Sequence, residues 1–297
     1  MTRHFLNLKD LSSKELEGII LHALSLKKEN SYSKELAGKY LALIFEKAST
    51  RTRISFEVAM NRLGGVASFL PTSDLHLGKR ESLEDTSRAV SSMADAIVLR
   101  TISHKTIERF ASVSSIPVIN GLSELSHPCQ LLADIMTFYE CNGDIKDKKV
   151  TWVGDCNNMF FSYMEASELM GFKLSVACPK RFWSTERKVL NSNVNFTEDL
   201  NKAAEESDLI TTDVWVSMGD EKESKERMKA FKSFQVSPEL MKLAKKNAIF
   251  LHCLPAIRGQ EISENMLEHP RSKVWQQAEN RVHAQKSLLL FLLKKSL

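Results

Sequence analysis

Long apolar runs are missing from this sequence. The longest apolar runs, such as residues 288–293, are far shorter than the roughly 20 residues that a membrane-spanning helix needs. Residues 1–7 also lack the apolar centre of a secretory signal peptide. With 43% hydrophobic and 26% charged residues, the composition is that of an ordinary folded protein. We therefore expect a soluble, cytoplasmic protein that does not enter a membrane.

Cysteine is scarce, and no two cysteines have the C-x-x-C spacing that is typical of zinc and redox sites. The five residues are scattered along the chain: Cys129, Cys141, Cys156, Cys178 and Cys253. An odd number without paired spacing favours reduced thiols, and hence a cytosolic protein. We predict no metal site.

Two glycine-rich phosphate loops are absent as well. Neither G-x-x-x-x-G-K-[ST] nor G-x-G-x-x-G occurs, which argues against a P-loop nucleotidase and against a nicotinamide or flavin dinucleotide. Neither sign of charge dominates, since 41 basic and 37 acidic residues give a net charge of +4. The basic stripe of nucleic-acid-binding proteins is missing, so we expect no nucleic-acid partner.

Apolar segments of strand length alternate with helical patterns along the chain, which is typical of α/β proteins with mostly parallel sheets. A length of 297 residues favours two domains. A turn followed by lysines at residues 142–149 separates two such alternations. We place the boundary near residue 145, so that residues 1–145 form the first domain and residues 146–277 the second.

Five strands and four helices are expected from the apolar patterns and the turn residues. Strands are expected at residues 40–45, 94–99, 117–119, 150–153 and 173–177, and helices from Ser49 to the glycines at 64 and 65, at residues 128–139, up to Gly171, and from about residue 278 to the C-terminus. The last helix carries a thick apolar stripe that must pack against the rest of the protein.

The segment S-T-R-T-R at residues 49–53 lies between an expected strand and an expected helix. Ser49 is a typical N-cap residue, so the helix would begin there. The unpaired N–H groups of a helix N-terminus favour anions, and the guanidinium groups of Arg51 and Arg53 match phosphate oxygens. We predict a phosphate site; a capped surface helix with solvated arginines is the alternative.

Further polar clusters follow the other expected strands. They are Arg100, residues 127–130, residues 155–158, residues 213–219 and residues 252–255. Because open α/β sheets bind ligands at the carboxyl ends of their strands, these clusters predict ligand sites. His127 precedes a proline at a helix N-terminus and should stay neutral. Taken singly, His127 and Asp213 could also be caps, and Cys253 a small buried apolar residue.

Together these clusters resemble the aspartate/ornithine carbamoyltransferase family. F-E-K at residues 45–47, S-T-R-T-R at 49–53 and H-P-C-Q at 127–130 are similar to the family's carbamoyl-phosphate signature. D-V-W-V-S-M-G at residues 213–219 and H-C-L-P at 252–255 are similar to its ornithine branch. The resemblance extends along nearly the whole chain. It implies two α/β domains with a cleft between them and a C-terminal helix that returns to the first domain.

The resemblance also implies a set of site residues for carbamoyl phosphate. The set is Ser49, Thr50, Arg51, Thr52, His76, Arg100, His127, Gln130, Cys253, Leu254 and Arg281. Arg100 and His127 would polarise the carbamoyl oxygen, and Gln130 would bind the carbamoyl NH2 group. Arg51, Arg100, His127, Asp213 and Cys253 are the implied catalytic residues. His76 matches a loop that the family lends to a neighbouring subunit, which implies a homotrimer or a multiple of trimers.

Asn158, Asp213, Ser217 and Met218 match the positions that bind ornithine in the family. The implied reaction is attack by the neutral δ-amine of ornithine on the carbamoyl carbon, with phosphate as leaving group and no cofactor. The S-M-G sequence argues against aspartate as acceptor. Putrescine, an N-acylated ornithine and a non-catalytic binding role stay as alternatives, as does a biosynthetic or catabolic direction in arginine metabolism.

The sequence departs from the family pattern at several places, among them a segment at residues 181–195 that is shorter than expected. Cys156 stands where glycine is usual, bulky residues 159–161 follow Asn158, and Gln276 and Gln277 replace a Pro-Glu pair. Cys156 and residues 159–161 fall next to an implied acceptor residue, so they could alter the acceptor pocket.

Overall fold

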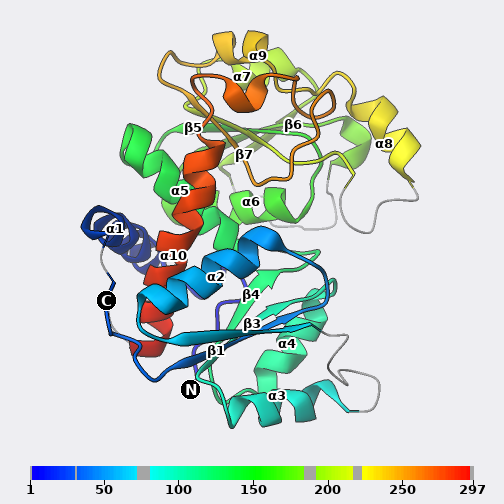
Figure 1. Ribbon diagram of the computed structural model, residues 1–297. Helices are drawn as coiled ribbons and strands as arrows, with labels where there is room; N and C mark the ends of the chain where they lie inside the picture. The colour runs from blue at the N-terminus through cyan, green and yellow to red at the C-terminus, as the bar shows by residue number, and fades with distance from the viewer. Residues whose placement is uncertain (1, 31, 72–80, 184–191, 217–222, 295–297) are drawn as a thin grey trace. The chain divides into compact units, whose positions relative to one another are not determined.

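A computed structural model describes residues 2–30, 32–71, 81–183, 192–216 and 223–294 of the chain (Figure 1). It forms two compact units, Met1–Met136 with Glu279–Leu297, and Thr137–Ala278. Each unit has a parallel sheet flanked by helices, which confirms the predicted α/β class. Among the described residues, no helix is long and apolar enough to cross a membrane.

The first unit contains a four-stranded parallel sheet in the order β2-β1-β3-β4. Its strands are β1 (Tyr40–Phe45), β2 (Val66–Pro71), β3 (Ala96–Arg100) and β4 (Val118–Leu122). Its helices are α1 (Ser13–Glu29), α2 (Thr50–Arg62), α3 (Leu83–Ser91), α4 (His104–Val113), the start of α5 (Pro128–Asn142) and most of α10 (Val274–Lys294). Figure 1 shows α3 and α4 on one side of this sheet and α2 and α10 on the other.

Alternation along the strands builds the core of this sheet. Ala42 and Ile44 of β1 share one face with Ile97 and Leu99 of β3, because side chains two residues apart point the same way. All are buried and belong to one cluster with the apolar stripe of α4, which includes Phe110. Full burial of a large apolar side chain in this cluster, such as Leu99 or Phe110, contributes about 1.5–3 kcal/mol of transfer free energy. The packed sheet is a rigid base for the loops at its edge.

The second unit contains a five-stranded parallel sheet in the order β7-β6-β5-β8-β9. Its strands are β5 (Lys149–Val153), β6 (Lys173–Ala177), β7 (Val194–Thr197), β8 (Leu209–Thr212) and β9 (Ile249–His252), and its helices include α6 (Asn158–Met170), α7 (Leu200–Ala204), α8 (Ser224–Phe231) and α9 (Pro238–Leu243). Trp152 packs against Phe160 and Tyr163 of α6, with ring centroids 6.4 and 5.7 Å apart. The bulky residues after Asn158 therefore serve the core, since Met159 and Phe160 are buried.

Both strand orders contain a point where the chain reverses its direction of travel across the sheet. In the first unit the chain moves from β1 out to β2 and returns to β3, so the reversal lies between β1 and β3. In the second it lies between β5 and β8. Ligands of open α/β sheets bind outside the carboxyl ends of the strands at such a point. A ligand site is therefore expected in the loops that follow these four strands.

Helix α10 confirms the prediction that the C-terminal helix returns to the first domain. Ser287 Oγ donates to the carbonyl oxygen of Ile19 in α1 at 2.9 Å, and Lys27 Nζ donates to Asn280 Oδ1 at 2.7 Å. The helix begins at Val274, about one turn before the expected residue 278. Boundary errors of this size arise because the first turn of a helix makes few hydrogen bonds of its own.

Candidate active site

Helix α2 begins where the sequence predicted. Ser49 is the N-cap, in extended backbone conformation, and its hydroxyl accepts a hydrogen bond from Thr52 N at 3.3 Å. The pairing of Phe45 with Arg100 places the end of β3 beside the loop that leads into α2. Glu46 N donates to the Arg100 carbonyl oxygen at 2.8 Å, which ties the two loops together. The first turn of α2 and Arg100 thus meet at the reversal point of the first sheet.

Arg53 does not join this group, although its guanidinium contributed to the predicted phosphate site. Its Nε donates to Glu57 Oε1 at 3.0 Å, one turn along the helix. The guanidinium also lies 4.0 Å from the ring centroid of Phe69. Alternate positions on a helix face different directions, so Arg51 and Arg53 cannot serve one small ligand equally.

Arg281 of α10 links α2 and α5 in the first unit. Its side chain is buried, and it donates through Nη1 to Gln130 Oε1 and through Nη2 to Thr52 Oγ1, the latter at 3.3 Å. Gln130 Nε2 in turn donates to Asp134 Oδ1 at 2.8 Å. The side-chain oxygen of Gln130, with its two lone pairs, is therefore the atom that could also accept from a ligand NH2 group.

His127 is buried and lies at the N-terminus of α5, directly before Pro128. Burial lowers the pKa of His127 well below its usual value, and the positive charges of Arg281, Arg100 and Arg51 lower it further. The imidazole is therefore neutral in the folded protein. Three arginines and a neutral imidazole in one place form an environment that favours an anion and can donate to a carbonyl oxygen.

The lowered pKa of His127 makes the stability of the protein depend on pH. The unfolded chain takes up a proton at this residue below about pH 6.5, whereas the folded protein does not, so the unfolded state gains protons as the pH falls. The free energy of unfolding should fall as the pH drops below 6.5, and His127 should account for up to about 1.4 kcal/mol of this fall per pH unit. Denaturant unfolding between pH 7 and pH 5.5 should show a shallower decline for His127→Gln than for the parent. Equal slopes would contradict a neutral buried His127.

In the second unit, the Asp213 carboxylate is held by three donors. Asp213 directly follows β8 and is nearly buried. Asn157 Nδ2 donates to its Oδ2 at 2.8 Å, while Val214 N and Cys253 Sγ donate to its Oδ1 at 2.8 and 3.1 Å. The pairing of β5, β8 and β9 brings these residues together, because Thr212 lies opposite both Val153 and His252. The site thus presents one fixed carboxylate.

Asn157 was missed in the sequence, which pointed to its neighbour Asn158. Asn157 is the N-cap of α6, and its Oδ1 accepts from the backbone N–H groups of Met159 and Phe160. Its Nδ2 is then left to face Asp213. The cap could have been foreseen from asparagine ahead of a helix, but the bond to a residue on another loop could not.

Cys253 and Leu254 follow β9 in a turn that is fixed by His252. The backbone N–H of Leu254 donates to His252 Nδ1 at 2.9 Å, which leaves the proton on Nε2, where Glu261 Oε1 lies 3.2 Å away. His252 N donates to Gln277 Oε1 at 3.1 Å. Gln277, which departs from the family's Pro-Glu pair, therefore supports the same turn. Leu254 itself has a positive φ of 57°, an uncommon conformation for a non-glycine residue. Asp213, His252 and Cys253 could approach one cation, but both ring nitrogens of His252 are already engaged.

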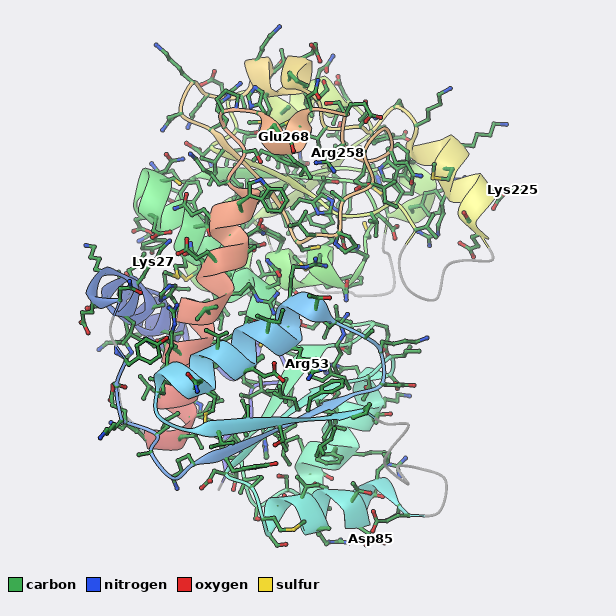
Figure 2. The ribbon with its side chains drawn as sticks, in the orientation of Figure 1. Lys27, Arg53, Asp85, Lys225, Arg258 and Glu268 are labelled. Carbon is green, nitrogen blue, oxygen red and sulfur yellow. The ribbon has the colours of Figure 1, made fainter. Side chains whose placement is uncertain are left out.

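Most of the implied site residues lie in the described part of the chain. Ser49, Thr50, Arg51, Thr52, Arg100, His127, Gln130 and Arg281 lie in the first unit, and Asn158, Asp213, Cys253 and Leu254 in the second. Asn158 is the first residue of α6. His76, Ser217 and Met218 lie outside the described residues. Figure 2 shows the side chains and labels Arg53 on α2.

Comparison with known proteins identifies the family. Residues 3–140 match the carbamoyl-P binding domain of aspartate/ornithine carbamoyltransferases, and residues 146–292 match their Asp/Orn binding domain. The chain belongs to the aspartate/ornithine carbamoyltransferase family. The match confirms the resemblance that the ordered sequence motifs indicated.

Relatives within this carbamoyltransferase family are similar over their full length. The chain is 52% identical to the ornithine carbamoyltransferase of Acinetobacter baylyi over 99% of this chain and 98% of that protein, and 50% identical to that of Psychrobacter cryohalolentis over 98% and 97%. Among solved structures, the ornithine carbamoyltransferase of Pyrococcus furiosus is 44% identical with a TM-score of 0.94, over 99% of this chain and 98% of that one. The anabolic enzyme of Campylobacter jejuni is 40% identical with a TM-score of 0.93 over the whole of both chains.

Proposed function

We propose that this protein transfers the carbamoyl group of carbamoyl phosphate to the δ-amine of L-ornithine, giving L-citrulline and phosphate. The observation that carries the proposal is the gathering of Arg51, Arg100 and Arg281 around a neutral His127. Arg51, Arg100 and His127 lie in the part of the chain that matches a carbamoyl-P binding domain. The choice of ornithine is supported by full-length relatives of that name.

In this proposal residues 1–145 bind carbamoyl phosphate. Ser49, Thr50, Arg51 and Thr52 hold the phosphate at the N-terminus of α2, where backbone N–H groups and the helix dipole favour an anion. Arg100 contacts both the phosphate and the carbamoyl oxygen, and His127 donates to the same oxygen. A neutral imidazole can do this without taking up a proton, which is consistent with the lowered pKa of His127.

The carbamoyl NH2 group is assigned to three oxygen acceptors. They are Gln130 Oε1 and the backbone carbonyl oxygens of Cys253 and Leu254. Arg281 already donates to Gln130 Oε1 and orients it. Acceptors fixed in this way distinguish a carbamoyl group from an acetyl group, which offers no N–H donors.

Residues 146–277 bind ornithine in this proposal, through Asn158, Asp213, Ser217 and Met218. The Asp213 carboxylate attracts a substrate ammonium group, with Cys253 beside it. Attack needs the neutral δ-amine, so the substrate must first lose a proton. The carbamoyl oxygen becomes negative in the tetrahedral intermediate, where Arg100, Thr52 and His127 stabilise it, and phosphate leaves with the proton. These steps need no metal or organic cofactor.

We also propose that the protein is located in the cytoplasm and forms a homotrimer or a multiple of trimers. The assembly is supported by D-L-H-L-G at residues 74–78, which resembles the loop that the family lends to a neighbouring subunit. Mass photometry should give a multiple of three times the chain mass of 33.6 kDa. Co-expressed His76→Ala and Arg51→Ala chains should regain activity, since some mixed sites then contain both native residues. A monomeric mass, or no activity above that of either variant alone, would contradict the assembly.

The acceptor is tested by product formation from carbamoyl phosphate with four separate amines: L-ornithine, putrescine, N-acetyl-L-ornithine and L-aspartate. Turnover with ornithine alone is expected. Turnover with another amine would retain the carbamoyl-phosphate site and overturn the assignment of the Asp213 side. No turnover with any of them would favour a non-catalytic binding protein.

A further inference from the structure

Two cysteines meet at the edge of the second sheet. Cys178 directly follows β6, and Cys156 lies in the loop after β5, the strand that pairs with β6 up to Val153 and Ala177. Gly154 N donates to the Ala177 carbonyl oxygen at 3.0 Å, which extends the pairing into the loop. The sulfur atoms of Cys156 and Cys178 are 4.0 Å apart. Because 22 residues separate the two cysteines, the sequence alone does not indicate this contact.

The two thiols differ in accessibility. Cys156 is partly exposed, whereas Cys178 is fully buried and donates to the Pro179 carbonyl oxygen at 3.6 Å. The hydrogen bond with Cys156 and burial both raise the pKa of Cys178, so this thiol keeps its proton. A dissolved oxidant therefore reaches Cys156 first, and the Cys178 sulfur lies next to the oxidised product.

The loop that carries Cys156 also carries two structural links. Asp155, one residue earlier, forms an ion pair with Arg227 of α8 at 2.7 Å, and both side chains are nearly buried. Asn157, one residue later, caps α6 and donates to Asp213. Both residues are bonded directly to Cys156, so a shift of its backbone moves them as well.

We propose that Cys156 and Cys178 form a reversible disulfide when the protein meets hydrogen peroxide, and that the disulfide weakens binding of the acceptor amine. The second half of this inference rests on the proposed function. Cys156 takes one oxygen from the peroxide to become a sulfenic acid as the O–O bond breaks. The Cys178 sulfur then attacks the Cys156 sulfur, and hydroxide leaves with the Cys178 proton as water. One peroxide and two thiols thus give one disulfide and two waters.

Closing the sulfur atoms from 4.0 Å to the ~2.05 Å of a disulfide must pull the loop toward β6. Asn157 would then lose its alignment with the Asp213 carboxylate. Asp213 would no longer be held in place for the substrate ammonium group, and loss of that charged hydrogen bond to the substrate corresponds to about a tenfold loss of affinity or more. We therefore expect the KM for ornithine to rise at least about tenfold in the oxidised protein, with binding of carbamoyl phosphate unchanged.

The test uses the full-length protein, fully reduced and then treated with hydrogen peroxide for minutes to hours. Remaining thiols are blocked, and the peptides of a non-reducing digest are identified by mass spectrometry. A peptide pair linked through Cys156 and Cys178 is expected, together with a raised KM for ornithine that dithiothreitol restores. Absence of this pair would overturn the inference even if the reduced enzyme makes citrulline. A reduced enzyme that makes none would instead refute the proposed function, and the linked peptides would still test the site.

Matched variants separate this pair from the other thiols. Cys156→Ser and Cys178→Ser should each be as active as the parent when reduced and should keep their KM for ornithine after peroxide treatment. Cys141→Ser, which changes a part-buried thiol elsewhere, should respond as the parent does. An equal rise of KM in Cys178→Ser would assign the effect to Cys253 or another thiol and overturn the inference. A linked pair without any change of KM would overturn its effect on the acceptor.

Discussion

Replacing Arg51 with alanine should lower kcat/KM for carbamoyl phosphate about 10²–10³-fold, the size of effect expected for removal of one preorganised donor from a site where negative charge develops. Arg51 lies on the first turn of α2, and its charge acts on the buried His127. The variant should unfold within about 1 kcal/mol of the parent, because Arg51 is only partly buried. Steady-state kinetics and urea unfolding measure the two quantities.

Arg53→Ala is the matched control for Arg51→Ala. It removes the same group two residues later on the same helix, but this guanidinium is paired with Glu57 and packed on Phe69. Its kcat/KM should stay within about threefold of the parent, since an exposed ion pair of this kind contributes little. Equal losses in the two variants would mean that general positive charge, and not the position of Arg51, governs binding.

Asp213→Asn should lower kcat/KM for ornithine by about 10²–10³-fold and leave the affinity for carbamoyl phosphate unchanged. The amide keeps the shape of the carboxylate but cannot attract an ammonium group by charge. It also sets an NH2 group where Asn157 or the other donors now find an acceptor. Kinetics with varied ornithine measure the loss, and calorimetric titration with carbamoyl phosphate measures the first substrate.

Asp208→Asn controls for loss of a buried carboxylate in the same sheet. Asp208 is buried and pairs with Lys245 at 2.9 Å, while its Oδ2 accepts from Lys149 N. Its replacement should cost about 1–3 kcal/mol of unfolding free energy and leave the KM for ornithine unchanged. If Asp208→Asn raised that KM as much as Asp213→Asn, loosening of the sheet would explain both variants.

The elements that the sequence predicted best are those with strong local signals. Residues 40–45 form β1 as expected, and Ser49 caps α2 because its hydroxyl reaches an N–H three residues away. The turn Asn142–Gly143 and the cap residue Gly171, with a positive φ of 72°, mark their helix ends equally clearly. Such signals need only neighbouring residues, so they can be read before the fold is known.

The order of the strands was beyond the reach of these local signals. The sequence predicted parallel sheets, but the placement of β1 between β2 and β3 depends on which apolar faces pack best over long distances. This order creates the reversal points on which the site is built. Local patterns therefore indicated which residues follow strands but not which strand ends meet.

Contacts between distant residues were the other missing part. Arg281 meets Gln130 across 151 residues, and Asn157 meets Asp213 across 56. Their residue types could be singled out, yet their partners depend on how β5 pairs with β8 and how α10 packs on α2. The catalytic and binding roles of the site residues stay predictions until variants are measured.

Isotope labelling shows whether the carbamoyl group itself reaches the δ-nitrogen of ornithine. Carbamoyl phosphate labelled with ¹³C is mixed with the protein and L-ornithine labelled with ¹⁵N at its δ-nitrogen, and the ¹³C NMR spectrum is followed. We expect a new carbonyl signal that is split by one directly bonded ¹⁵N and that grows as phosphate is released. Release of phosphate with the ¹³C appearing only in carbonate or cyanate, without any ¹³C–¹⁵N coupling, would contradict the proposed carbamoyl transfer.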